Sequence, residues 1–135
     1  MERIVWNREW ELGEAHLDRQ HGAMVAGINR MAMALEEGRP QPEIRRTLSL
    51  LLIYVETHFR DEEAVMARIG FPDFEGHRHQ HTDCTRQVER LLKRCRDGDP
   101  GLLTELMRFL AYWLTEHLDS ADRSLAQFIR LGATA

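Results

Sequence analysis

Two pairs of potential metal-binding residues are spaced four positions apart in this sequence. Glu62 follows His58 at this distance, and His81 follows His77. On an α-helix, a separation of four places both side chains on one face, one turn apart. Imidazole nitrogens and carboxylate oxygens are donors that bind transition metals, so each pair could supply neighbouring ligands to a metal ion.

These side chains interrupt an apolar pattern that predicts a buried helix face. Between Ile44 and Ile69, the residues at three- and four-residue spacing are apolar except at His58 and Glu62. Burying a carboxylate and an imidazole without partners would cost roughly several kcal/mol, which is comparable with the whole stability of a small domain. We therefore expect a partner for both groups inside the core.

Two more histidines occupy apolar faces, and two others do not. His21 and His117 fall among the core positions of the first and the last predicted helix. His79 faces about 200° away from His77 on an ideal helix, and His16 lies off the apolar face of its helix. We expect His16 and His79 to be solvated and not to bind metal.

The elements that must position these residues are four amphipathic helices. We expect them to span about residues 15–37, 42–68, 74–96 and 101–131, with breaks at Gly38, at Gly70-Phe71-Pro72 and at the turn 97–100. Residues 1–13 have no clear period, which indicates an extended arm laid across the domain. Residues 1–135 thus form one domain, and the short connections favour an all-α, up-down-up-down antiparallel four-helix bundle.

This topology brings the polar core positions to one level. His21 and the pair His77 and His81 come early in their helices, whereas His58 with Glu62 comes late and His117 comes past the middle. Because neighbouring helices run in opposite directions, all six side chains lie toward the same end of the bundle. Five imidazoles and a carboxylate inside one apolar core indicate a metal site.

Composition excludes several other kinds of protein. The chain is 43% hydrophobic and 30% charged, with a formal net charge of −4 and no basic block, so we expect no nucleic-acid partner. It has no apolar run suited to a signal peptide or a membrane span, so we expect a cytoplasmic protein. Cys84 and Cys95 fall on one predicted helix, about 16 Å apart, and are expected to be core thiols without a disulfide.

The order of these motifs resembles the hemerythrin family, specifically its single-domain bacteriohemerythrins. The resemblance covers essentially the whole chain. It rests on Leu17-Asp-Arg-Gln-His21, on His58-Phe-Arg-Asp-Glu62, on Gly-Phe-Pro before His77-x-x-x-His81, and on Trp113-Leu-x-x-His117-x-x-x-x-Asp122. It implies the hemerythrin bundle and a non-haem di-iron centre that binds dioxygen reversibly.

The family pattern also selects a seventh ligand, which spacing alone leaves open. Glu116, Asp119 and Asp122 all lie near His117, and a regular helix puts Asp122 about 140° away from it. A local wide turn of the π type would bring the two onto a common face. By resemblance, two iron ions are held by His21, His58, Glu62, His77, His81, His117 and Asp122.

Counting ligands predicts an open coordination position. If Glu62, Asp122 and a solvent-derived oxygen bridge the two ions, a three-to-two division of the histidines leaves one octahedral ion a ligand short. The family assigns His77, His81 and His117 to the full ion, and His21 with His58 to the open one. Around the open position we expect an apolar pocket of Met24, Phe59, Trp113 and Leu114, and by resemblance Leu114 lies nearest the bound ligand.

The resemblance implies an oxygen carrier or store and not an enzyme. Ferritin-like di-iron oxidases use carboxylate-rich sites with two Glu-x-x-His motifs, and this sequence contains no such motif. The alternative is a sensor of oxygen, nitric oxide or redox state that acts through a separate partner protein. The sequence does not identify a protein that would receive the oxygen.

Overall fold

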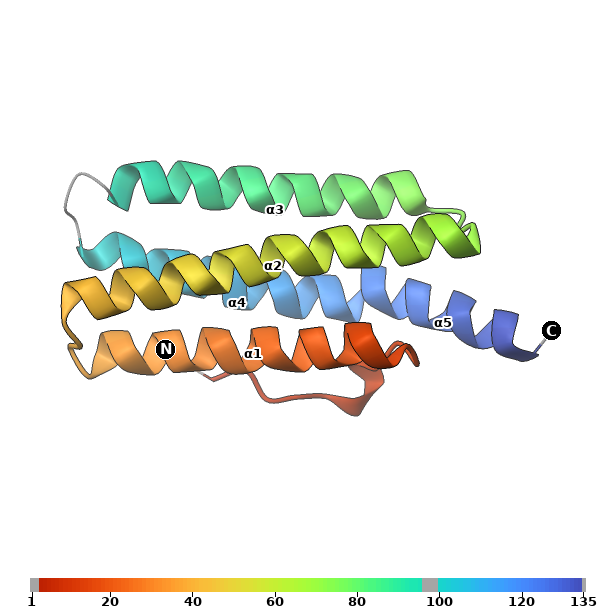
Figure 1. Ribbon diagram of the computed structural model, residues 1–135, viewed down its shortest axis with the longest axis horizontal. Helices are drawn as coiled ribbons and strands as arrows, with labels where there is room; N and C mark the ends of the chain where they lie inside the picture. Colours follow the sequence, from red (N-terminus) through yellow and green to blue (C-terminus); the bar gives the residue numbers. More distant parts are fainter. Residues whose placement is uncertain (1–2, 96–99, 135) are drawn as a thin grey trace.

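The computed structural model describes residues 3–95 and 100–134, and almost all of the described residues are helical (Figure 1). The elements, in chain order, are the 3₁₀ turn η1 (Arg8–Trp10) and the α-helices α1 (Ala15–Glu36), α2 (Gln41–Ile69), α3 (Phe74–Cys95), α4 (Pro100–Asp119) and α5 (Ala121–Thr134). The expected turn at 97–100 lies largely outside the described residues, as does the expected last residue of the third helix, Arg96.

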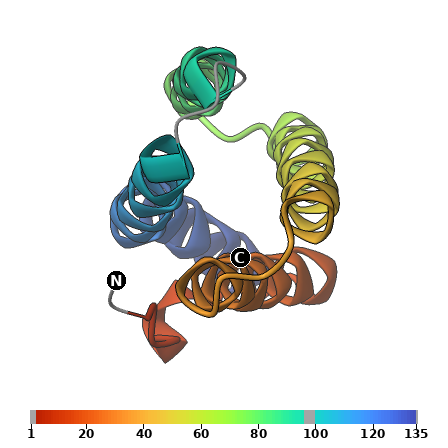
Figure 2. The same ribbon diagram turned by 90° about the vertical axis from the view of Figure 1, so that its left-hand side faces the viewer.

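The helices form the predicted antiparallel bundle. Helix α1 packs against α2 and α4, and α3 packs against the same two helices, so each of the four has two neighbours. The end-on view in Figure 2 shows the four helices at the corners of a square, with consecutive helices on adjacent corners. Helix α5 continues from α4 and extends beyond the other helices (Figure 1). The fold class is therefore confirmed.

The fourth predicted helix, expected to be continuous over 101–131, is divided in two at Ser120. Ser120 lies outside both α4 and α5, and its hydroxyl donates to the Glu116 carbonyl oxygen at 2.7 Å. Such a bond from a serine side chain to the preceding turn is known to bend helices. The predicted departure from a regular helix is therefore present near residue 120, but as a break between two helices and not as a π turn within one.

Burial after Ser120 does not follow the four-residue spacing from His117. That spacing would bury Ala121. Instead Ala121 is only partly buried and Asp122 is 1% exposed, followed by the buried Leu125 and Ala126. Asp122 thus lies in the core four residues after the buried Leu118 and two residues after the break.

The N-terminal arm lies across the bundle as expected and is held by specific contacts. The Asn29 side chain accepts from the Ile4 N–H and donates to the Ile4 carbonyl, both at 2.9 Å. The Trp10 ring is 5% exposed, and its Nε1–H donates to Asp119 Oδ1 at 2.6 Å. The arm therefore contacts both α1 and the end of α4.

Helix ends follow the local sequence. Gly70 takes a left-handed conformation (φ 68°) directly after α2, which a residue without a Cβ adopts at little cost. Phe71 and Pro72 then lead into α3. The Phe71 N–H donates back to the Met66 carbonyl at 3.0 Å. This hydrogen bond satisfies a carbonyl in the last turn of α2 before the chain reverses direction.

The apolar core consists of two clusters separated by a polar layer. The large cluster contains Trp10, Met24, Val25, Ile28, Met31, Ile44, Leu48, Leu51, Val55, Phe59, Cys84, Val88, Leu103, Leu106, Met107, Leu110, Leu114 and Leu118. The small cluster contains Leu12, Leu17, Met66, Phe71, Leu125 and Ala126. Along α1, for example, His21 stands between Leu17 of the small cluster and Met24 of the large one. The predicted polar positions are therefore enclosed by apolar side chains on both sides.

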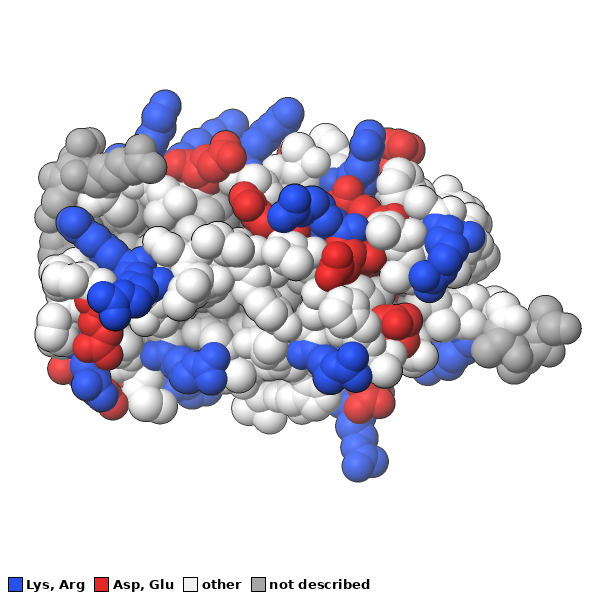
Figure 3. Space-filling model, in the orientation of Figure 1, with Lys and Arg blue, Asp and Glu red and all other residues white. Residues whose placement is uncertain are grey.

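The surface shows no segregation of charge on the face drawn in Figure 3, where acidic and basic side chains are interspersed. Within the described residues, no helix has a stretch long and apolar enough to cross a membrane.

Candidate metal centre

Seven predicted ligands come together in the polar layer, and each is at most 3% exposed. They are His21 from α1, His58 and Glu62 from α2, His77 and His81 from α3, His117 from α4 and Asp122 from α5. Every helix of the bundle thus contributes at least one side chain. Because each contribution replaces an apolar residue on the buried face of its helix, the helix packing itself brings the seven groups together.

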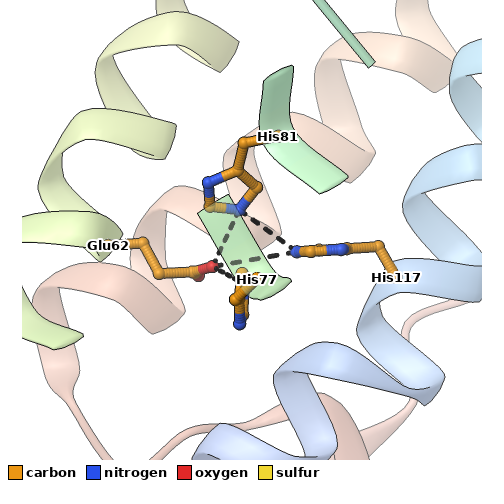
Figure 4. A group of neighbouring side chains, drawn as sticks. All are labelled: Glu62, His77, His81 and His117. Atoms are coloured by element: carbon orange, nitrogen blue, oxygen red, sulfur yellow. Dashed lines mark hydrogen bonds and ion pairs between the residues drawn. The ribbon is translucent and has the colours of Figure 1, made fainter. Parts of the chain in front are cut away.

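The two oxygens of Glu62 face two different groups of histidines. Oε1 lies 2.6 Å from His77 Nε2, 3.2 Å from His81 Nε2 and 3.8 Å from His117 Nε2. Figure 4 shows these three imidazoles around the carboxylate. On the other side, Oε2 lies 3.1 Å from both His21 Nε2 and His58 Nε2.

Asp122 divides its oxygens in the same way. Oδ1 lies 3.1 Å from His77 Nε2 and 3.4 Å from His117 Nε2, whereas Oδ2 lies 3.3 Å from His21 Nε2. Asp119, one of the acids that spacing left open, instead accepts the Trp10 indole N–H and is half exposed. Of these two aspartates, only Asp122 reaches the polar layer.

The histidines therefore separate into a group of three and a group of two, with a carboxylate between them. The donor atoms of Glu62, His77, His81 and His117 all lie within 4.8 Å of one another, and so do those of His21, His58 and Glu62. We call these the three-histidine side and the two-histidine side of the centre. Two adjacent ions could each be met by one side, with Glu62 common to both.

Several inward-facing atoms lack hydrogen-bond partners among the described residues, which is the arrangement expected of metal ligands. These atoms are Glu62 Oε1, His77 Nε2 and both carboxylate oxygens of Asp122. Although His77 Nε2 and Glu62 Oε1 are only 2.6 Å apart, they are not aligned as donor and acceptor. Leaving buried polar groups unsatisfied costs about 1–3 kcal/mol each, and a cation between them would remove this cost. The donor set of imidazoles and carboxylates thus fits transition-metal ions.

The electrostatic field of the two carboxylates also favours a cation here. Burial lowers the pKa of His117, but the attraction of Asp122 and Glu62 outweighs burial and raises the pKa to about 10. For His77 burial is likewise outweighed, chiefly by Asp122 and Glu62, and the pKa rises to about 9. Burial raises the pKa of Glu62, but the surrounding imidazoles, led by His58, lower it well below its usual value. The layer therefore stabilises positive charge, whether carried by protons or by metal.

Three residues that the sequence analysis did not single out hold the outer ring nitrogens of the histidines. His58 Nδ1 lies 2.8 Å from Gln20 Oε1, His81 Nδ1 lies 2.8 Å from Glu63 Oε2, and His117 Nδ1 lies 2.8 Å from Gln80 Oε1. An oxygen at this position requires Nδ1 to carry the proton, which leaves Nε2 free as a ligand. Each of the three is adjacent in sequence to a predicted ligand, and this adjacency is the signal that could have identified them.

The four predicted pocket residues are all in or beside the large cluster. Met24 and Leu114 are each 2% exposed. The Phe59 ring stacks on His81 with centroids 4.1 Å apart, and the Trp113 ring stacks on His117 at 4.4 Å. Phe59 and Trp113 thus cover imidazoles of the three-histidine side.

The remaining histidines and both cysteines lie outside the centre. His16 and His79 are exposed and pair with Asp61 and Asp83 respectively. Cys84 is a free buried thiol whose pKa burial raises to about 12, and Cys95 is a free, partly buried thiol. The prediction that His16 and His79 are solvated is confirmed, as is the prediction that the two cysteines form no disulfide.

Comparison with known proteins identifies the family. Residues 12–129 match the model of the hemerythrin HHE cation binding domain. A protein of Ralstonia nicotianae named bacteriohemerythrin is 29% identical over 126 residues, which cover 93% of this chain and 88% of the relative. Another of the same name, from Methylococcus capsulatus, is 28% identical over 124 residues, covering 91% and 94%. A third, from Clostridium acetobutylicum, is 25% identical and covers 89% and 96%. The chain therefore belongs to the hemerythrin family, whose members hold a di-iron centre and bind oxygen.

Proposed function

We propose that this protein binds dioxygen reversibly, for transport, storage or delivery, at two iron ions held by His21, His58, Glu62, His77, His81, His117 and Asp122. The observation that carries the proposal is the unequal division of the imidazoles between the two sides of Glu62 and Asp122. The name of the bacterial relatives, bacteriohemerythrin, agrees with it.

The unequal division leaves the two-histidine side one protein ligand short. If Glu62 and Asp122 were shared between two ions with a solvent-derived oxygen, the three-histidine side would complete an octahedral set and the two-histidine side would not. A small diatomic molecule can then be accommodated beside His21 and His58. When bound, the di-iron pair supplies the two electrons that dioxygen takes up and gives back.

The protein's own residues keep this reaction reversible by excluding water. Met24 and Leu114 lie next to the polar layer within the large cluster and are each 2% exposed. On the other side, Leu17, Met66 and Leu125 of the small cluster are fully buried. These side chains would keep bulk water and its protons away from the polar layer.

The proposal is tested directly by visible spectroscopy of the reduced, iron-loaded protein. We expect a charge-transfer band to appear on exposure to air and to disappear when the solution is degassed. Several cycles with constant amplitude would support reversible binding. Irreversible oxidation in the first cycle would contradict it and favour a sensor of oxygen or redox state.

The choice of Asp122 as bridging ligand is tested by replacing each aspartate in turn. Asp122→Ala removes a shared ligand, so we expect iron to fall from two ions per chain to one or none. Asp119→Ala removes a carboxylate three residues away that contacts Trp10 instead, and it should retain two ions. Iron analysis after purification distinguishes them, and full loading of Asp122→Ala with loss in Asp119→Ala would show that the assignment is wrong.

Removing the metal should destabilise one part of the fold more than another. Without iron, the buried carboxylates and imidazoles lose their compensating partner, so the free energy of unfolding should fall. Amide exchange should accelerate most in the small cluster around Met66 and Leu125, which the polar layer separates from the large cluster. Amides near Leu51, Val88 and Leu106 should stay protected. Equal loss of protection in both clusters would contradict this expectation.

Leu114 is expected to protect bound oxygen without binding metal. Leu114→Ala should cost about 2–5 kcal/mol, as is usual for a buried leucine, and should retain two ions. Water admitted by the new cavity should make the oxygenated form decay faster than in the parent. The control is Leu110→Ala, which makes the same change one turn farther from His117 at an equally buried site. Equal decay rates for both variants and the parent would show that Leu114 only fills space.

A further inference from the structure

A chain of hydrogen bonds leads from the surface of the protein to His58 on the two-histidine side. The exposed His16 places its Nε2 3.0 Å from Asp61 Oδ2, and Gln20 Nε2 donates to the same oxygen at 2.7 Å. The other end of the Gln20 amide, Oε1, lies 2.8 Å from His58 Nδ1. His58 Nε2 then faces Glu62 Oε2 at 3.1 Å. Each step is short enough for a hydrogen bond or a close polar contact.

The donor-to-acceptor direction of these hydrogen bonds is fixed at Asp61. The Asp61 side chain is 38% exposed, and an exposed aspartate is a carboxylate at neutral pH, so it can only accept. Gln20 must therefore turn its NH₂ group toward Asp61, which leaves its carbonyl oxygen toward His58. That oxygen in turn requires a proton on His58 Nδ1. The lone pair of His58 is consequently on Nε2, inside the polar layer.

We propose that Asp61 is a positioning residue for the metal centre, which acts through Gln20 to hold His58 in the tautomer that can bind metal. The inference rests on the proposed function only in taking His58 as an iron ligand. Asp61 itself is 38% exposed at its side chain, and its hydrogen bonds go to His16 and Gln20, neither of which is a predicted ligand. Its effect therefore depends on the orientation of a single buried amide.

The comparison with His81, whose outer partner is a carboxylate, shows what Asp61 adds to the amide of Gln20. Glu63 accepts directly from His81 Nδ1–H. Because Glu63 is a carboxylate, it has no N–H group that could face the ring instead. Gln20 is an amide, and if it were reversed it would present its NH₂ to His58 and favour the wrong tautomer. Gln20 is only 4% exposed, so bulk water cannot readily supply the acceptor that Asp61 provides.

The test compares Asp61→Leu with Asp83→Leu in the iron-loaded, reduced protein. Asp83 is a matched control, because its carboxylate also pairs with an exposed histidine, His79, but leads to no ligand. Loss of an outer partner typically weakens metal binding about 10- to 100-fold. We therefore expect iron release to an excess of chelator to accelerate by about tenfold or more in Asp61→Leu and to be unchanged in Asp83→Leu.

A second measurement reports on the ring itself and does not involve oxygen. Ring N–H protons of iron-bound histidines give strongly shifted, solvent-exchangeable proton resonances in the paramagnetic protein. In Asp61→Leu we expect one of these resonances to shift and to exchange faster with D₂O, and we expect the same resonance to change in Gln20→Leu. If Asp61 only stabilised the packing of α1 against α2, its replacement would lower the melting temperature without changing one of these resonances more than the others.

Two further variants test whether Asp61 acts by orienting the Gln20 amide. The alternatives are that it acts through its charge or independently of Gln20. Asp61→Asn keeps an oxygen that can accept from Gln20, so it should restore most of the parental release rate and spectrum. In the double variant Gln20→Leu/Asp61→Leu, the second change should add nothing to the first, because Asp61 acts through Gln20. Additive effects of the two changes would overturn the proposed route.

The inference fails if folded Asp61→Leu releases iron at the parental rate with all ring N–H resonances unchanged. It survives if the parent holds two ions but its oxygen band is not reversible, since that result contradicts only the proposed function. A parent protein that holds no iron would overturn both.

Discussion

The structure depends on two carboxylates, Glu62 and Asp122, buried side by side in an apolar core. Neither is tolerable there alone, because a buried unpaired charge costs several kcal/mol or more. Five imidazoles surround the pair, and these are themselves buried at the expense of hydration. The four helices must therefore meet at one height with little freedom to slide, and the same constraint that fixes the bundle also fixes the spacing of the proposed metal ligands.

A repeated arrangement supports the ligands from outside. In three cases a residue adjacent to a ligand on one helix holds the outer nitrogen of a histidine on the next: Gln20 of α1 for His58, Glu63 of α2 for His81, and Gln80 of α3 for His117. An adjacent residue is rotated by about 100° around the helix, so it faces the neighbouring helix when the ligand faces the core. The ligands and their supports are thus provided by consecutive positions.

Sequence periodicity was sufficient to predict the bundle, the polar layer and six of its members, because a polar residue on an otherwise apolar face is conspicuous. It could not select Asp122, since a regular helix directs that residue away from His117, and only the family pattern indicated it. The break at Ser120 could not be predicted either, because serine is common inside helices and gives no strong signal. Gln20, Glu63 and Gln80 were missed because a polar residue beside a ligand resembles any solvent-facing position.

The order of the ligands along the chain has a consequence for synthesis on the ribosome. His21, His58 and Glu62 all belong to the hairpin of α1 and α2, which is complete at Ile69. The three-histidine side also requires α3 and α4, and Asp122 lies on the last helix to be made. A nascent chain therefore contains every histidine of the two-histidine side long before the three-histidine side is made, and no chain shorter than 122 residues possesses both carboxylates.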